Sequence, residues 1–280
     1  MRILFCGVAA IALSGCSWMG FGSGQNSHSY GNNSHGNYSY GCCGEGQKLS
    51  RWNFEETAGA DYIVGGTAIT GSQTSTTSPA PLMALTDVDM KDAYKTGFSV
   101  GLGGSYALNP NRKIVMEGTY SNAKGKDITW GTQGGGNLSG HMSDYNAYGI
   151  NVGLRQYSRP VSVPLLRSVR PYVEARAGVQ RVGAISLDKI SQGVATSPNT
   201  PTSLNMYDRG WVPTGSAIIG FETPVFNRFT LGVESGIRYS GKLKSDNSDV
   251  AAGFNTRYAG FNNGGERYTV PVTIRGRYRF

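Results

Sequence analysis

Eight stretches of the chain alternate apolar side chains with small or polar ones, and this period of two constrains the fold more than any other feature. Successive side chains of a β-strand point to opposite faces, so the pattern predicts strands with one apolar and one polar face. The predicted strands lie near Asp61–Gly71, Tyr94–Leu108, Lys113–Asn122, Tyr145–Tyr157, Pro171–Gly183, Trp211–Thr223, Arg228–Ser240 and Arg267–Phe280.

The composition excludes several other classes of protein. Charged residues make up only 16% of the chain, against about 25% in an average soluble domain. Beyond the first residues, no apolar run approaches the roughly 20 residues that a membrane-spanning helix needs. The net charge of +8 is spread along the chain without a basic block, so no nucleic-acid partner is expected. These observations leave a soluble all-β protein or a membrane β-barrel.

The connections between the predicted strands alternate in length. Three are shorter, near Asn109, Ser158 and Pro224, although the middle one is long for a turn. The other four are long and polar, and they run near 72–92, 123–144, 184–210 and 241–266. Short turns at one end and long loops at the other are typical of outer-membrane barrels.

Ionised residues occupy the middle of the predicted polar faces. The apolar core of a soluble sandwich would not tolerate them, whereas a polar barrel lumen would. We therefore expect a network of charges inside a barrel, with five Arg against three Glu. Its members are Glu117, Arg155, Glu174, Arg176, Glu234, Arg238, Arg275 and Arg277.

The last predicted strand ends in Tyr278-Arg279-Phe280 and resembles the closing strand of Gram-negative outer-membrane barrels. From about Ala60 to Phe280 the chain is similar to the small OmpA-like and OmpX-like barrels. The resemblance implies an all-β fold, an eight-stranded antiparallel transmembrane β-barrel, in which closure gives every backbone group in lipid a partner. It also implies that Tyr278 and Phe280 form an assembly signal, and that outer-membrane lipid and the barrel-assembly machinery are partners.

The start of the chain has the layout of a secretory signal. A basic residue, Arg2, precedes the apolar run Ile3–Leu13 and two small residues. The stretch Leu13–Cys16 resembles the bacterial lipobox, which implies cleavage before Cys16 and lipidation of its thiol. Ser17 in place of Asp favours the outer membrane by the same resemblance. We expect a signal peptide at 1–15, a flexible Gly/Ser/Asn-rich periplasmic tether at 16–58 and the barrel at 59–280.

Two adjacent cysteines, Cys42 and Cys43, lie in the predicted tether. Neighbouring cysteines rarely bond to each other without strain, so in an oxidising periplasm they are available for a disulfide with another chain. Neither a CxxC nor an HxxxH spacing accompanies them, so no metal site is expected. The sequence implies no cofactor.

Eight strands enclose a space that side chains nearly fill. We therefore expect a structural or protein-interaction role in the cell envelope, with a lumen plugged by charges and an envelope partner bound through the tail or loops. A narrow pore for small solutes is one alternative. The other is a lipid-modifying enzyme, since His141 and Ser143 resemble the His-x-Ser pair of lipid A deacylases. This pair lies at the edge of a Gly-rich loop instead of in the barrel wall, so the leading expectation is that the protein is not an enzyme.

Overall fold

The computed structural model describes residues 51–71, 73–74, 83–133, 135–163, 166–193, 201–249 and 258–280. All of them belong to one compact unit, Glu45–Phe280. The predicted signal peptide, the lipidation site Cys16 and the pair Cys42 and Cys43 lie outside the described residues. No helix in the described part of the chain has the length and apolarity to cross a membrane.

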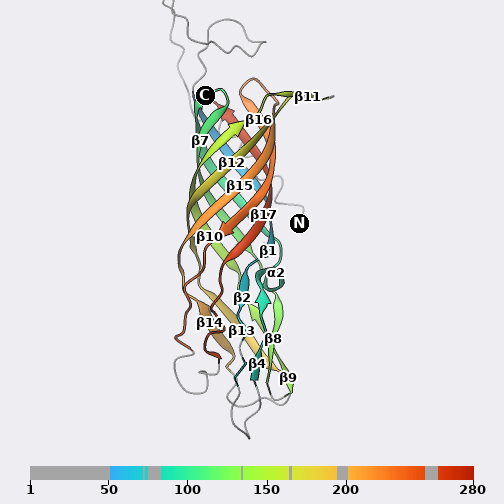
Figure 1. The fold of residues 1–280 in the computed structure, drawn as a ribbon, viewed down its shortest axis with the longest axis vertical. Helices are drawn as coiled ribbons and strands as arrows, with labels where there is room; N and C mark the ends of the chain where they lie inside the picture. Colours follow the sequence, from blue (N-terminus) through green and yellow to red (C-terminus); the bar gives the residue numbers. More distant parts are fainter. Residues whose placement is uncertain are drawn as a thin grey trace, which may run out of the picture. The chain divides into compact units, whose positions relative to one another are not determined.

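Eight long strands form a closed antiparallel barrel (Figure 1). Strand β1 (Trp52–Gly65) pairs with the second barrel strand on one side and with the last on the other, which closes the wall. Each remaining strand pairs with its neighbours in chain order, which confirms the predicted fold class. These strands are β6 (Gly97–Asn109), β7 (Arg112–Ala123), β10 (Tyr145–Tyr157), β12 (Leu166–Val182), β15 (Gly210–Pro224), β16 (Phe229–Ser240) and β17 (Arg267–Arg279).

Strand β1 begins earlier than the sequence predicts. It starts at Trp52, so residues 52–58 are barrel wall and not tether, and the boundary at 59 was placed too late. The small residues Ala58–Ala60 interrupt the large apolar side chains, which hides the alternation in this strand. The strand also ends sooner, at Gly65, because Gly66 has φ +106° and a Cβ there would collide with the carbonyl of Glu266.

The outward face of the barrel is a belt of large apolar side chains. Leu102, Met116 and Ile219 each remain 59% exposed in the isolated chain. Toward one end the belt is bordered by aromatic rings, among them Tyr120, whose ring centroid lies 4.9 Å from that of Tyr148. An apolar belt edged by aromatic rings is typical of a protein surface that faces the hydrocarbon core of a membrane, with the rings at the polar interfaces.

One end of the barrel, here termed the turn end, carries the short connections and the C-terminus (Figure 1). Only Pro110 and Asn111 separate β6 from β7, and residues 225–228 join β15 to β16. The longer connection near Ser158 is a hairpin, because β11 (Val161–Val163) pairs with the beginning of β12. This connection is long because the strand pair continues past the end of the barrel wall.

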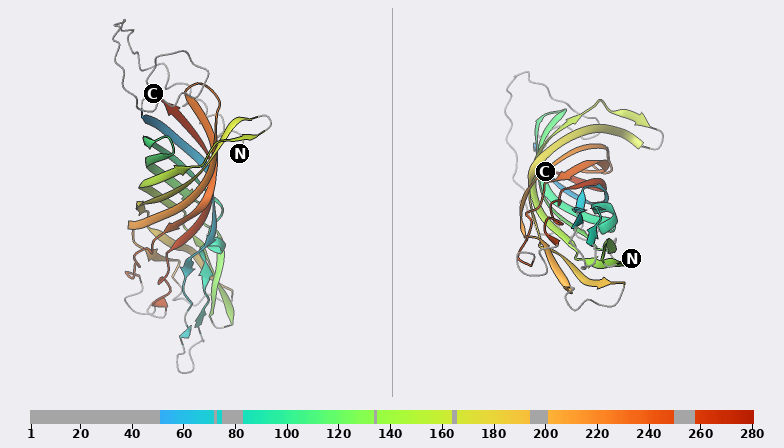
Figure 2. Two further views of the ribbon diagram at one scale, coloured as in Figure 1. Left: turned by 45° about the horizontal axis from the view of Figure 1, so that its top comes forward. Right: turned by 60° about the horizontal axis from the view of Figure 1, so that its bottom comes forward.

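At the opposite end, the loop end, the four long connections fold into what we term the extension (Figures 1 and 2). It comprises a six-stranded sheet in the order β14-β13-β9-β8-β4-β3, the pair β2–β5 and a short helix. Its elements are β2 (Thr67–Ile69), β3 (Gln73–Thr74), β4 (Met83–Leu85), β5 (Val88–Asp89), α2 (Met90–Ala93), β8 (Asp127–Gln133), β9 (Gly136–Met142), β13 (Ile185–Gln192) and β14 (Ser203–Tyr207).

The extension has an apolar core of its own, so the expectation of four simple polar loops was wrong. Trp130 of β8 is fully buried, with its ring centroid 5.5 Å from that of Tyr258 and 6.0 Å from that of Phe261. Leu138, Leu187 and other apolar side chains from all four connections complete the core. Each connection alone is short of apolar residues, and only their assembly buries enough surface to hold them together.

Candidate functional site

The barrel lumen holds the largest concentration of charged side chains in the described residues. Strand alternation directs all eight predicted residues inward, and all except the half-buried Arg238 are buried. The structure brings seven of them together in a cluster and places Arg238 in a separate pair nearer the loop end.

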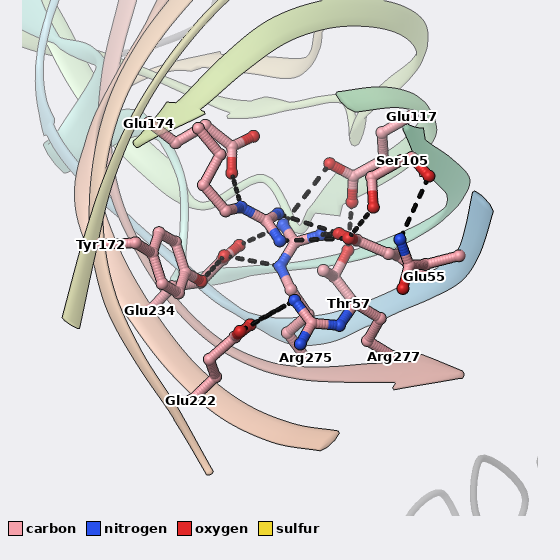
Figure 3. Close-up of polar contacts among 12 residues, drawn as sticks. Glu55, Thr57, Ser105, Glu117, Tyr172, Glu174, Glu222, Glu234, Arg275 and Arg277 are labelled. Atoms are coloured by element: carbon pink, nitrogen blue, oxygen red, sulfur yellow. Dashed lines mark hydrogen bonds and ion pairs between the residues drawn. The ribbon is translucent and has the colours of Figure 1, made fainter. Parts of the chain in front are cut away.

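Two arginines bridge the centre of the cluster. Arg155 Nη2 lies 2.9 Å from Glu55 Oε2, and Arg155 Nε lies 2.6 Å from Glu174 Oε2. Arg275 Nη1 lies 2.6 Å from Glu55 Oε2, and its Nε lies 2.8 Å from Glu234 Oε2. Figure 3 shows Glu55 and Glu234 turned toward the guanidinium group of Arg275. Each buried guanidinium therefore joins two carboxylates from different strands, an arrangement in which charge-assisted hydrogen bonds are strong.

Arg176 extends this cluster along β12. It pairs with Glu117 of β7 and with Glu174 of its own strand. From the same strand, the Tyr172 hydroxyl donates to Glu234 Oε2 of β16 at 2.7 Å. These bonds satisfy carboxylate oxygens that would otherwise be desolvated without partners.

Inward-facing glycines leave the space that these long side chains occupy. A Cβ at Gly101 would collide with the carboxylate of Glu117. A Cβ at Gly220 would collide with the Tyr172 ring. Larger residues at either position would displace cluster members, so glycine here supports the packing of the lumen.

A second layer of polar contacts lies at the turn end. Arg277 Nη1 donates to Glu222 Oε2 at 2.8 Å and to the Tyr157 hydroxyl at 2.7 Å. Tyr157 in turn donates to Glu222 at 3.2 Å. The buried Lys113 has its Nζ 5.2 Å from the centroid of the Tyr157 ring and has no hydrogen-bond partner within the described part of the chain.

A third layer lies at the loop end. Arg238 Nη1 is 3.0 Å from Asp61 Oδ2, and the Ser99 hydroxyl donates to Asp61 Oδ1 at 3.2 Å. Nearby, the guanidinium carbon of Arg267 lies 3.7 Å from the ring centroid of Tyr145. Polar contacts therefore cross the lumen at three levels along the barrel.

Sequence reasoning missed five charged lumen residues. Glu55 precedes the predicted start of its strand, and Glu222 lies at the predicted end of another. Once all five are included, the predicted excess of cations narrows to one, because six carboxylates face seven cations. The carboxylates are those of Glu55, Asp61, Glu117, Glu174, Glu222 and Glu234, and the cations are Lys113, Arg155, Arg176, Arg238, Arg267, Arg275 and Arg277.

The two residues of the enzyme alternative lie in the extension, at the end of β9 and just beyond it. His141 Nδ1 lies 2.7 Å from Asp127 Oδ1, and the Ser143 hydroxyl accepts a hydrogen bond from the backbone nitrogen of Ser186 at 2.9 Å. Within the described residues His141 and Ser143 share no hydrogen bond, and no group of His, Cys, Asp or Glu is placed to hold a metal ion. The pair therefore does not form a preassembled nucleophile and base.

Several titratable groups of the extension have shifted pKa values, among them Asp144, Tyr94 and Tyr207. The hydrogen bond from Lys124 lowers the pKa of Asp144 below its ordinary value. Burial raises the pKa of Tyr94 and of Tyr207 well above that of a free tyrosine. The Tyr207 hydroxyl donates to the Ala68 carbonyl at 2.8 Å, so this tyrosine stays neutral and joins two connections of the extension.

The predicted assembly signal lies at the turn end of β17. Tyr278 pairs with Phe54 of β1 and Phe229 of β16, and its ring meets that of Phe280 edge-on at 5.6 Å between centroids. Phe280 is 48% exposed. Both rings therefore lie at the border of the apolar belt.

Comparison with known proteins gives similarity of shape only. No protein-family profile matches the chain, and no curated protein sequence matches it. Neisserial surface protein A is 14% identical, with a TM-score of 0.39, over 84% of this chain and 100% of its own. Ail of Yersinia pestis is 11% identical, with a TM-score of 0.36, over 82% and 100%. The outer membrane protease OmpT of Escherichia coli is 8% identical, with a TM-score of 0.34, over 84% and 99%. Likeness at this level does not indicate an activity.

Proposed function

We propose that this protein is a Gram-negative outer-membrane β-barrel with a structural or protein-interaction role, whose lumen is occluded by charged side chains. The observation that carries the proposal is the set of ion pairs across the lumen, together with the apolar belt outside. A wall whose outer face is apolar and whose inner face is charged fits a barrel in lipid. It does not fit a soluble β-sandwich, whose inner faces are apolar.

Burial of the cluster supports the occlusion. The side chains of Arg155 and Glu174 are 0% exposed, and that of Arg275 is 2% exposed. Carboxylates and guanidinium groups at these distances exclude water from the centre, and breaking them apart is costly. The narrow-pore alternative requires these pairs to open.

The test of occlusion is conductance in planar bilayers. We expect the folded protein to show no steady open channel, because paired side chains block the lumen. The double variant Arg155→Ala/Glu174→Ala removes both partners of one pair and is expected to raise the conductance. Folding of the variant is checked by the difference in gel migration between its heated and unheated forms. A steady channel of porin size in the unaltered protein would contradict the proposal.

The interaction role rests on the extension. Its apolar core gives the loop end a fixed shape, and a fixed surface loses less conformational entropy on binding than free loops do. With the short turns in the periplasm, the extension is presented at the cell surface. We expect a cysteine introduced at the exposed Thr129 to react in intact cells with a maleimide that does not cross membranes, and one introduced at the exposed Arg228 of the turn end not to react. The reverse labelling pattern would refute this orientation.

The lipid anchor at Cys16 and the periplasmic tether remain part of the proposal through the lipobox resemblance. The enzyme alternative has weaker support, because His141 and Ser143 bind other groups. It predicts that His141→Ala changes the mass profile of lipid A in cells, whereas the structural role predicts an unchanged profile.

A further inference from the structure

We propose that three cations at the loop ends of adjacent strands, Arg181, Arg209 and Lys242, bind the phosphate groups of a phosphorylated glycolipid in the surrounding leaflet. We term them the basic patch. The inference rests on the proposed outer-membrane placement, in which the loop end meets the outward leaflet.

Strand register brings the three cations to one side of the barrel. Arg181 lies on the outward face near the end of β12, opposite Tyr148 of β10 and Trp211 of β15. Arg209 immediately precedes β15, whose first residue pairs with the last of β12. Lys242 follows β16, next to a glycine whose nitrogen donates to the Pro213 carbonyl of β15 at 2.9 Å. The patch therefore spans the neighbouring strands β12, β15 and β16.

The charges of the basic patch are free, in contrast to those of nearby lysines. The side chains of Arg181, Arg209 and Lys242 are exposed and form no hydrogen bond or ion pair within the described residues. By comparison, Lys124 is paired with Asp144, and Lys244 with Asp208. Free guanidinium and ammonium groups attract anions, and the planar fork of arginine matches the geometry of phosphate oxygens.

The surface beside the patch indicates a lipid instead of free phosphate. Trp211 is 64% exposed and Tyr148 is 63% exposed, directly beside Arg181 in the register. Val179 and Ile219 continue the apolar surface toward the middle of the belt. Aromatic side chains favour the interface between head groups and acyl chains, and basic residues there attract anionic head groups. Phosphates at the patch would place acyl chains along this apolar face.

The test uses the purified full-length protein in detergent, titrated with lipids and followed by native mass spectrometry. The probes are bisphosphorylated lipid A, its dephosphorylated form, phosphatidylglycerol and inorganic phosphate. We expect lipid A to bind most tightly and the triple variant Arg181→Gln/Arg209→Gln/Lys242→Gln to bind it at least about tenfold more weakly. The matched control, Arg112→Gln/Arg159→Gln/Arg228→Gln, removes three exposed cations from the turn end and is expected to keep full affinity.

Four results would overturn the inference. These are unchanged affinity in the basic-patch variant, an equal loss in the turn-end control, equal binding of the dephosphorylated lipid, and equal binding of phosphatidylglycerol or phosphate. Cell fractionation separates this inference from the proposed function, because the variant is expected to reach the outer membrane. If the unaltered protein were absent from that membrane and still bound lipid A in detergent, the proposed function would fail while the site remained.

Discussion

At the scale of single residues, the lumen depends on side chains that each satisfy several partners. Arg155 is the most enclosed of them, with bonds to Glu55, Glu174 and the hydroxyl of Tyr157. Removal of one member of such a group leaves buried carboxylates with fewer partners to offset their desolvation. The loss of folding free energy is therefore larger than for any single contact at the surface.

Replacement of this arginine tests the energetic weight of the cluster. We expect Arg155→Met to lower the free energy of unfolding by about 3–5 kcal/mol, as measured from urea unfolding in detergent micelles. The control Arg112→Met, at an exposed position, is expected to change it by less than about 0.5 kcal/mol. The pair Arg155→Met/Glu174→Gln is expected to cost less than the sum of the single changes, and strict additivity would contradict coupling across the cluster.

A second residue, Glu56, lies on the outward face of β1. It pairs with Leu102 and Gly276, and its side chain lies over that glycine without an ion pair among the described residues. A carboxylate in a hydrocarbon belt costs free energy. Glu56→Leu is expected to raise the free energy of unfolding in lipid vesicles by about 1 kcal/mol, against no gain for Ala58→Leu on the same face. If Glu56→Leu instead lowered the free energy of unfolding, the interpretation of Glu56 as a carboxylate without an ion pair would be contradicted.

At the scale of elements, the extension is a small folded body built from four separate connections. Its sheet shares no strand with the barrel, and its core, which also takes in side chains from the loop ends of barrel strands such as Ala147 and Val182, is apolar where the lumen is charged. The two bodies therefore obtain their stability from different interactions: hydrophobic burial in the extension, and ladder bonds and ion pairs in the barrel. A change in one core is expected to leave the other largely intact.

The buried Trp130 allows this independence to be tested. Trp130→Ala is expected to lower the local stability of the extension by about 3–5 kcal/mol, because it leaves a large cavity. Faster hydrogen exchange is expected in β8, β9 and β13, with no change in the barrel strands. Thr129→Ala, at the exposed neighbouring position, serves as the control. Simultaneous acceleration in the barrel would show that the two bodies unfold together.

The junction between β7 and β10 contains a measurable electrostatic contact, the pair Lys124 and Asp144. The pKa of Asp144 is lower in the folded protein than in the unfolded chain. Its carboxylate therefore stabilises the folded state fully at pH values above the pKa of the unfolded chain. This stabilisation is lost as the pH falls through the pKa of the folded state. Because Lys124 is largely exposed and Asp144 is one-third exposed, the stabilisation is small. Lys124→Ala is expected to raise the pKa of Asp144 toward that of a free aspartate in a carbon-13 NMR titration. An unchanged titration would refute the assigned cause.

At the scale of the whole molecule, the apolar belt surrounds a barrel that closes on itself. Large side chains such as Leu102 and Ile150 remain exposed on all sides of the isolated chain. Under the proposed function, burial of this surface in lipid supplies the attachment, so the lipid proposed on Cys16 is redundant for insertion. Its expected role is to fix the tether to the periplasmic face.

A cysteine replacement tests this division of roles. Cys16→Ala is expected to abolish incorporation of labelled fatty acid, while the barrel stays in the membrane fraction after an alkaline carbonate wash. The migration difference between heated and unheated protein reports that the barrel is folded. Loss of the folded form from the membrane would show that the lipid is needed for insertion.

The sequence by itself determined the barrel, because each strand except β1 shows a clear period of two. That period also directed Glu117, Arg155, Glu174 and the other predicted charges inward. It did not reveal Glu55, since the small residues of β1 hide the alternation there.

Only the tertiary structure decided which charges meet and how the long connections fold. Arg275 bonds to Glu55 across 220 residues of sequence, a pairing set by barrel closure. The core of the extension likewise joins short apolar stretches from four connections, each too small to predict a fold alone. Local periodicity specifies a strand, whereas contacts between distant strands exist only once the chain has closed.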